Sequence, residues 1–249
     1  MKPALSKNFS YIVIALILVL GSLIYSNTLR APFVFDDEPF IVYNKNIKDL
    51  GNLTAIWQAA AVPSRFISFL SFAINYHFNG QEVSSYHLVN IGIHLINALL
   101  VYWLMMITLR RGAVPAPFRG GPGDPAPTVY NRYLFSACVA LLFLTHPIQT
   151  QAVTYITQRF TSLATLFYLA TICFYASGRI YRKPIYYGIA VFSAVLAMFT
   201  KEIALTLPIT VILYDIYFVG ARSPRPSMEG RETRPLQNKR SGSLRSFCP

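Results

Sequence analysis

The fold is decided by residues 9–40, FSYIVIALILVLGSLIYSNTLRAPFVFDDEPF, in which a long apolar run leads directly into three consecutive acids. Residues 9–29 are long enough to cross a bilayer, which takes about 20 apolar residues. The run is longer than the apolar core of a cleavable signal peptide, so we interpret it as an uncleaved first span. Asp36, Asp37 and Glu38 therefore lie at a membrane surface. Two prolines and flanking aromatic residues predict a fixed loop there, and an ordinary solvated turn is the alternative.

The composition of the whole chain is that of a membrane protein. Of its 249 residues 54% are hydrophobic and only 13% are charged, whereas charged residues make up about 25% of a soluble domain. The net charge of +12 comes from Lys and Arg in the loops and the tail, which is a pattern of membrane topology rather than of nucleic-acid binding. The three cysteines form neither a disulfide framework nor a metal-binding spacing.

Several apolar runs predict an all-α, polytopic transmembrane helical bundle of about six spans. We expect a transmembrane region over residues 1–219, a structured first loop over residues 30–86, and a basic disordered tail over residues 220–249. Within the first loop, residues 53–60 predict a short surface helix. Residues 66–78 are too short for a span and favour a helix that lies in the interface or re-enters the membrane. The expected spans are residues 9–29, 87–109, 133–145, 161–177, 184–200 and 203–219.

The distribution of basic residues predicts the orientation of these spans. With the N-terminus inside, the inner segments hold sixteen of the 22 Lys and Arg residues, in agreement with the positive-inside rule. We therefore expect both termini in the cytoplasm of a multi-pass protein, in a bacterial inner membrane or an endoplasmic reticulum membrane. The same orientation collects most of the polar residues that lie near span ends on the outer face.

The second expected span carries a stripe of polar residues. His87, Asn90, His94 and Asn97 are spaced by 3, 4 and 3 positions and so share one face of a helix. Polar groups are costly in lipid, so this face must contact protein or water. Hydrogen bonds between helices are the favoured interpretation. A transport path is the alternative, although the chain shows no inverted repeat of the kind that many transporters have.

Residues of the outer face suit the transfer of a group from a lipid-linked phosphate. A carboxylate can remove a proton from an acceptor hydroxyl, and cations can hold the anionic leaving group. Arg65, Arg159 and Lys201 are candidates to bind the phosphate, although basic residues at this depth often only contact headgroups. Three adjacent acids point in different directions, so we predict no metal site. A divalent cation stays open as a candidate cofactor.

The amino-acid sequences of several segments resemble those of a known family. Phe35-Asp36-Asp37 after a first span resembles the acidic motif of GT-C membrane glycosyltransferases. The longer resemblance, to transmembrane proteins with C-terminal TPR repeats that are similar to protein O-mannosyltransferases, runs from about residue 25 to 218. It is carried by residues 65–72 (RFISFLSF), 86–90 (YHLVN), 94–97 (HLIN), His146-Pro147, Gln158-Arg159 and Lys201-Glu202.

The resemblance implies the transfer of a sugar from a polyprenyl-phosphate donor to an acceptor, with protein hydroxyls expected, on the outer or lumenal face of the bilayer. It implies that Asp36 is catalytic, with Asp37 as the close alternative. Further accessory candidates are Glu38, His87, His146 and Glu202. The family continues into further spans and TPR repeats, so we expect a truncated or frameshifted product. A non-catalytic membrane scaffold or inactive fragment is therefore the alternative function, followed by a transporter.

Overall fold

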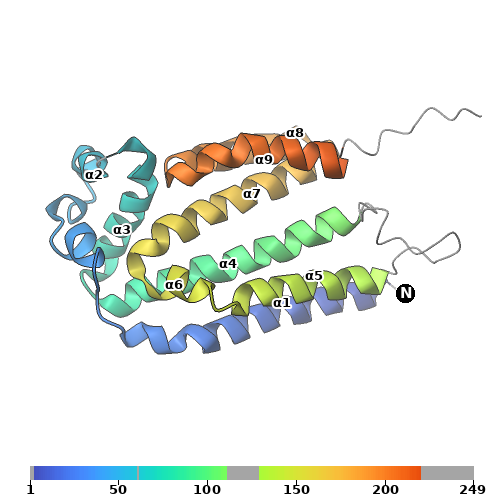
Figure 1. The fold of residues 1–249 in the computed structure, drawn as a ribbon, viewed down its shortest axis with the longest axis horizontal. Helices are drawn as coiled ribbons and strands as arrows, with labels where there is room; N and C mark the ends of the chain where they lie inside the picture. Colours follow the sequence, from blue (N-terminus) through green and yellow to red (C-terminus); the bar gives the residue numbers. More distant parts are fainter. Residues whose placement is uncertain (1–2, 61, 111–128, 220–249) are drawn as a thin grey trace, which may run out of the picture.

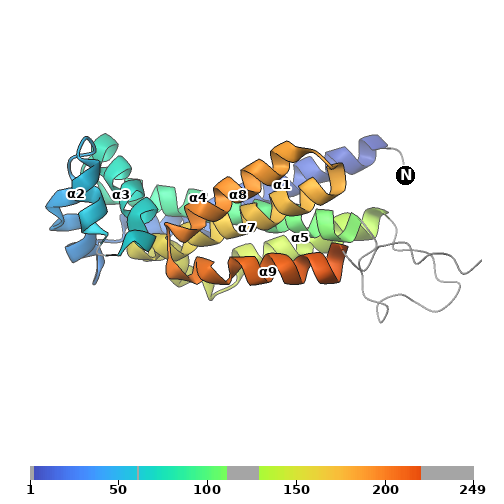
Figure 2. The same cartoon turned by 90° about the horizontal axis from the view of Figure 1, so that it is seen from above.

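The computed structural model describes residues 3–60, 62–110 and 129–219, and every regular element within these ranges is a helix. Six helices run along the long axis of the molecule (Figures 1 and 2). Helix α4 packs against α1, α5 and α7, and α7 packs in turn against α8 and α9. The all-α bundle is confirmed. The six helices are α1 Pro3–Tyr25, α4 Val83–Arg110, α5 Val129–Thr145, α7 Arg159–Tyr181, α8 Pro184–Met198 and α9 Leu207–Tyr214.

The shorter elements gather at one end of this bundle, which we call the loop end (Figure 1). The start of α1 and the π-helical turn η8, Asp215–Val219, lie at the opposite end. The elements of the loop end are η1 Ser26–Arg30, η2 Glu38–Val42, η3 Lys45–Ile47, α2 Leu53–Ala59, η4 Pro63–Arg65, α3 Phe66–Asn79, α6 Gln149–Thr154, η6 Ile156–Gln158 and η7 Glu202–Thr206.

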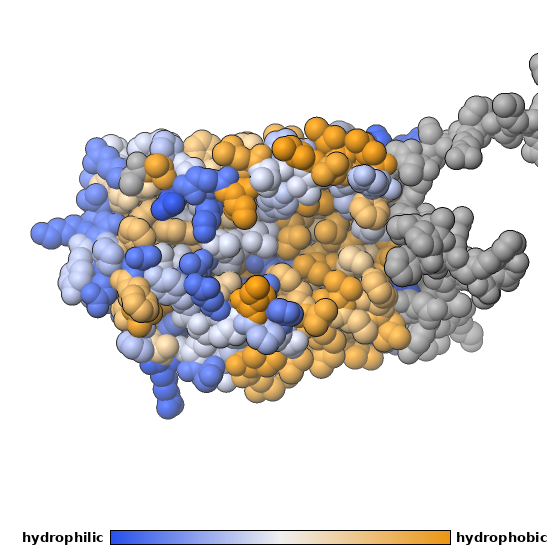
Figure 3. Space-filling view, in the orientation of Figure 1, coloured by the Kyte–Doolittle hydropathy of each residue, from blue (hydrophilic) through white to orange (hydrophobic). Residues whose placement is uncertain are grey.

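Among the described residues, three helices are long and apolar enough to cross a membrane. They are Asn8–Arg30, Val83–Leu109 and Ile156–Tyr181, and two shorter apolar helices, Arg132–Thr145 and Pro184–Met198, lie beside them. In Figure 3 an apolar band covers the bundle, whereas hydrophilic residues gather at the loop end. Side chains such as Val191 and Phe192 of α8 are exposed on this apolar surface, as lipid-facing residues are. The chain is a multi-pass membrane protein.

Two large cores hold the described part of the molecule together, beside a small third cluster of Ala197, Ala204 and Leu207. One lies between α1, α4 and α5 and includes Ile17, Ala98 and Leu144. The other lies at the loop end, where Ile41 and Ile47 of the first loop pack against residues of α3, α4 and α7. The second core makes the first loop part of the folded body, as predicted for residues 30–86. It fixes the acids of that loop relative to the start of α7.

The polar stripe of α4 is buried, as predicted. His87, Asn90, His94 and Asn97 are each no more than 2% exposed. Backbone carbonyls on other segments are partners of each: Asn90 Nδ2 donates to Ile156 O at 3.2 Å, Asn97 Nδ2 donates to Ser162 O at 2.9 Å, and His94 Nε2 lies 3.1 Å from Leu144 O. Asn90 Oδ1 also accepts from the side chain of Arg159. The stripe therefore forms hydrogen bonds between helices, which was the favoured interpretation.

The last expected span differs in detail from the prediction. Residues 203–219 are divided into the 3-10 turn η7, helix α9 and the π-helical turn η8. Pro208, in the first turn of α9, has no N–H to donate and is suited to a helix start. Residues 53–60 and 66–78 do form the helices α2 and α3. The predicted disordered tail, residues 220–249, and most of the predicted loop before α5 lie outside the described residues.

Candidate active site

The acids of the first loop lie in a sharply turned segment. Phe35 has a φ of 49°, a left-handed conformation that costs a residue other than glycine on the order of 1–3 kcal/mol. Backbone N–H groups then close the turn, from Asp37 to Val34 O at 3.0 Å and from Glu38 to Phe35 O at 3.2 Å. The surrounding contacts must hold this conformation in place.

Asp37 supplies the strongest of these contacts. Its side chain is 1% exposed. One carboxylate oxygen accepts a hydrogen bond from Val34 N at 3.1 Å, and the other accepts from Thr157 N at 2.8 Å and from Thr157 Oγ1. Because all of these donors come from the protein, Asp37 anchors the loop to η6 and is not open to a substrate.

Asp36 is exposed beside it. Its backbone N–H donates to the hydroxyl of Tyr155 at 3.0 Å. Burial, together with the negative charge of the nearby Asp36 carboxylate, raises the pKa of Tyr155. The phenol therefore stays protonated and can donate toward the carboxylate. The adjacent acids thus separate into a buried anchor and an exposed carboxylate at a fixed position.

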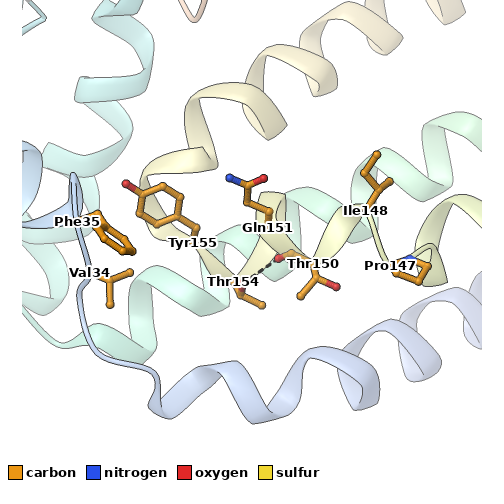
Figure 4. A pocket seen from close by; sticks show the side chains of 8 residues that line it. All are labelled: Val34, Phe35, Pro147, Ile148, Thr150, Gln151, Thr154 and Tyr155. Carbon is orange, nitrogen blue, oxygen red and sulfur yellow. Dashed lines mark hydrogen bonds between the residues drawn. The ribbon is translucent and has the colours of Figure 1, made fainter.

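An open groove lies next to Asp36, between the first loop and α6 (Figure 4). Its volume is about 630 Å³. We call it the Tyr155 groove. Its lining residues, all uncharged, are Val34, Phe35, Pro147, Ile148, Thr150, Gln151, Thr154 and Tyr155. Sequence reasoning did not identify Tyr155 or Gln151, because only the folded first loop brings α6 and Asp36 together.

The candidate cations form a second cluster at the loop end. Arg65 Nε lies 3.0 Å from Glu202 Oε1, which also accepts from Ser64 Oγ at 3.1 Å. Lys201 Nζ donates to Thr161 Oγ1 at 2.6 Å. The backbone N–H of Glu202, then Arg65 and Ser64, lower the pKa of its carboxyl. Burial and the charge of Arg65 lower the pKa of Lys201.

The start of α7 connects this cluster to the acidic loop. The Phe160 ring lies 6.0 Å from the Phe40 ring and 6.0 Å from the guanidinium of Arg65. Thr157 binds Asp37 and Thr161 binds Lys201, four residues apart. Thr157 lies in the 3-10 turn η6, and Thr161 lies in the first turn of α7, which follows it directly. The anchors of the acid and of the cations are therefore neighbours.

Arg159 does not reach the surface, where the sequence had placed it as a phosphate ligand. Its side chain is fully buried. Nε donates to Asn90 Oδ1 at 2.7 Å, and NH2 donates to Asn75 Oδ1 at 3.0 Å and to Tyr86 O at 2.9 Å. The guanidinium also lies over the ring of Phe72, 4.6 Å from its centroid. Arg159 thus connects α3, α4 and α7 from inside.

The accessory candidates occupy different environments. Glu38 and His146 are exposed, and His146 Nδ1 accepts from Ile148 N at 3.2 Å at the start of α6. His87 is buried, and its Nε2 lies 3.0 Å from Ala31 O, so it supports the first loop from below. Among the described residues no group of three His, Cys, Asp or Glu side chains is placed to hold a metal ion.

A bundle of apolar helices with a carboxylate, a groove and a cation cluster at one end defines a multi-pass membrane protein with an acid-and-cation site. The chain is similar to protein O-mannosyl-transferases. It is 27% identical to Tmtc3 of Drosophila melanogaster over 80% of this chain and 23% of that protein. It is 25% identical to human TMTC4 over 82% of this chain and 29% of that protein. It is 28% identical to tmtc2 of Xenopus laevis over 80% of this chain and 23% of that protein.

These similarities confirm the resemblance that the motifs indicated. The chain spans between 21% and 29% of the length of the curated relatives it matches. No family model matches the chain. No solved structure matches it either.

Proposed function

We propose that this chain carries the catalytic acid of a membrane glycosyltransferase, which moves a sugar from a polyprenyl-phosphate donor to a protein hydroxyl on the outer or lumenal face. One observation carries the proposal: Asp36 is exposed, yet its loop is held rigidly by buried Asp37. The relatives, which are named protein O-mannosyl-transferases, support mannose as the first sugar to test.

The proposed chemistry needs one proton acceptor and a binding site for the leaving phosphate. The Asp36 carboxylate takes the proton of the acceptor hydroxyl while the hydroxyl oxygen bonds to the anomeric carbon of the sugar. The bond from that carbon to the phosphate oxygen breaks, and the polyprenyl phosphate leaves with the electron pair. Arg65 and Lys201 hold its negative charge. Asp37 is a positioning residue.

The first test is a transfer assay on the full chain in liposomes, with polyprenyl-phosphate mannose and a peptide that contains Ser and Thr. Asp36→Asn keeps the size of the side chain and removes the base, so the rate should fall by about 10²- to 10⁴-fold. Glu38→Gln is the matched control, because Glu38 is also exposed in the same turn. An active Asp36→Asn variant contradicts the proposal.

The second candidate function is a non-catalytic membrane scaffold. It is favoured by the structural use of Asp37 and Arg159, two predicted site residues that are buried and hydrogen-bonded within the protein. A scaffold neither transfers mannose nor changes its donor affinity when Arg65 or Lys201 is replaced. The transporter alternative loses its motivation, because the polar stripe of α4 is hydrogen-bonded inside the protein.

A further inference from the structure

We propose that the Tyr155 groove binds the acceptor, as an extended and uncharged peptide segment whose Ser or Thr hydroxyl reaches Asp36. This inference deepens the proposed function and rests on it. The hydroxyl of Tyr155 forms the wall of the groove nearest the acid and contacts the backbone of Asp36 at 3.0 Å. A segment that lies along α6 therefore passes the exposed carboxylate.

The charges around the groove favour binding of the uncharged acceptor there and binding of the phosphate donor elsewhere. All of the described residues that line it are uncharged. Exposed Asp36 follows Phe35 of the lining directly, and exposed Glu38 lies in the same turn. These carboxylates repel a phosphate. The cations Arg65 and Lys201 belong to the separate cluster around Glu202, so the donor headgroup and the occupant of the groove bind at different places.

The groove presents apolar side chains that a water-soluble surface would avoid. Phe35 is 86% exposed and Ile148 is 73% exposed, and both line it. The strained backbone of Phe35 holds its ring edge-on against Tyr155, with the ring centroids 6.5 Å apart. On a membrane protein such exposed apolar groups contact either lipid or a bound partner, and the cross-linking experiment below distinguishes the two. Strain kept at such a position indicates a functional constraint.

The Gln151 amide is a polar group of the lining that is free to bind a peptide. The hydroxyl of Thr154 donates to the carbonyl of Thr150 within α6 (Figure 4). The amide of Gln151, on the same helix, makes no hydrogen bond with another of the described residues, and it is exposed. A primary amide can donate to and accept from one peptide group at the same time. Gln151 can therefore pair with the N–H and the C=O of an extended backbone, whereas a lipid chain offers it no hydrogen bond.

Photo-cross-linking tests the occupant directly. A photoreactive amino acid is placed at Ile148 in the full chain in liposomes, and the control places it at Gln149, which is outside the lining. The probes are an uncharged, end-capped peptide of Thr, Ala and Pro, and polyprenyl phosphate. We expect position 148 to capture the peptide and position 149 to capture neither probe. Capture of the lipid at position 148, equal capture of the peptide at both positions, or no capture overturns the inference.

Kinetics give a second readout. Gln151→Ala should raise the KM for the peptide by roughly 2- to 10-fold, the equivalent of one hydrogen bond, and leave the KM for the donor unchanged. Gln149→Ala should change neither constant. If the native chain captures the peptide but transfers no sugar, the proposed function fails and the groove assignment stands. If Gln151→Ala alters only the donor KM, the assignment fails while the transferase stands.

Discussion

The adjacent residues Asp36 and Asp37 have opposite environments, so replacing each by Asn should have a different effect on stability. Asp37 accepts hydrogen bonds from Val34 and Thr157 and is buried. In Asp37→Asn the amide NH2 cannot accept a hydrogen bond, so at least one buried donor loses its partner, at a cost of about 1–3 kcal/mol. We expect a lower melting temperature and faster proteolysis within residues 31–43. Asp36→Asn should leave both unchanged, because its carboxylate is exposed.

A second variant separates the anchor from general damage to the fold. Thr157→Val keeps the shape of the side chain but removes one of the two donors that Thr157 offers to Asp37. It should reproduce part of the loss of Asp37→Asn and add little to it in the double variant. Independent, additive losses would show that Asp37 acts on the loop through another contact.

The Glu202 carboxyl predicts a dependence of stability on pH. Hydrogen bonds from its own backbone N–H, Arg65 and Ser64 lower its pKa below the ordinary value of 4.5. A lowered pKa means that the ion stabilises the folded state above the unfolded pKa, and that this contribution disappears as pH falls through the folded pKa. The pair is partly exposed, so the contribution is less than about 1 kcal/mol. The melting temperature of the native chain should exceed that of Glu202→Gln at pH 7, and the difference should shrink as the pH falls below 4.5.

The control for this comparison is Glu82→Gln. The Glu82 carboxylate is exposed at the loop end and forms no ion pair with another described residue. The difference in melting temperature between Glu82→Gln and the native chain should not show the same dependence on pH.

The same Glu202→Gln variant also tests donor binding, because the Glu202 carboxylate pairs with Arg65 and offsets its positive charge. If Arg65 binds phosphate, removing that charge should tighten the binding of polyprenyl phosphate. Weaker binding would mean that Glu202 positions Arg65.

Helices α3, α4 and α7 meet at the buried Arg159 guanidinium. Replacing it by Met removes the donor to Asn90 Oδ1 and the donor to Asn75 Oδ1, which then lie buried without that partner. The expected loss of stability is about 3 kcal/mol or more. Arg159→Lys should recover only part of the lost stability, because an ammonium cannot form the planar set of hydrogen bonds that a guanidinium forms. Lys183→Met, at an exposed position after α7, is the control.

Donor binding distinguishes this role from phosphate recognition. For the fraction of Arg159→Met that remains folded, the affinity for polyprenyl phosphate should equal that of the native chain. Arg65→Met should show the reverse, with a nearly unchanged melting temperature and weaker lipid binding. A folded Arg159→Met protein that had lost lipid binding would restore Arg159 as a phosphate ligand.

The helices were predictable from the sequence because their causes are local. The length of the apolar runs predicts the long helices. A buried face on α4 is predicted by the spacing of His87, Asn90, His94 and Asn97. The partners of that face were not predictable, because Arg159 and Ser162 lie more than 60 residues further along the chain. The roles of Asp36 and Asp37 were open for the same reason. Only the contact with Thr157, 120 residues away, separates them.

The arrangement of the described molecule groups its polar segments at the two ends of the helical bundle (Figure 1). The first loop, α6 and Lys201-Glu202 lie at the loop end (Figure 1). The start of α1, the end of α4 and the turn between α7 and α8 lie at the opposite end (Figure 1). Apolar helix surface covers the distance between them (Figure 3). A single face of the membrane can therefore present both the acid and the cations.

Labelling of single cysteines tests which face this is. Basic residues remain on the cytoplasmic side, and Arg179, Arg182 and Lys183 follow one another at the opposite end, so the loop end should face outward. In a variant whose native cysteines are replaced by Ser, a cysteine at Phe78, which is 76% exposed on α3, should react with an impermeant thiol reagent in intact cells or sealed organelle vesicles of known orientation. A cysteine at Lys183 should react only after the membrane is opened. The reverse pattern would place Asp36, Arg65 and Lys201 on the cytoplasmic side, where a lumenal donor headgroup is out of reach, and the proposed transfer on the outer face would fail with it.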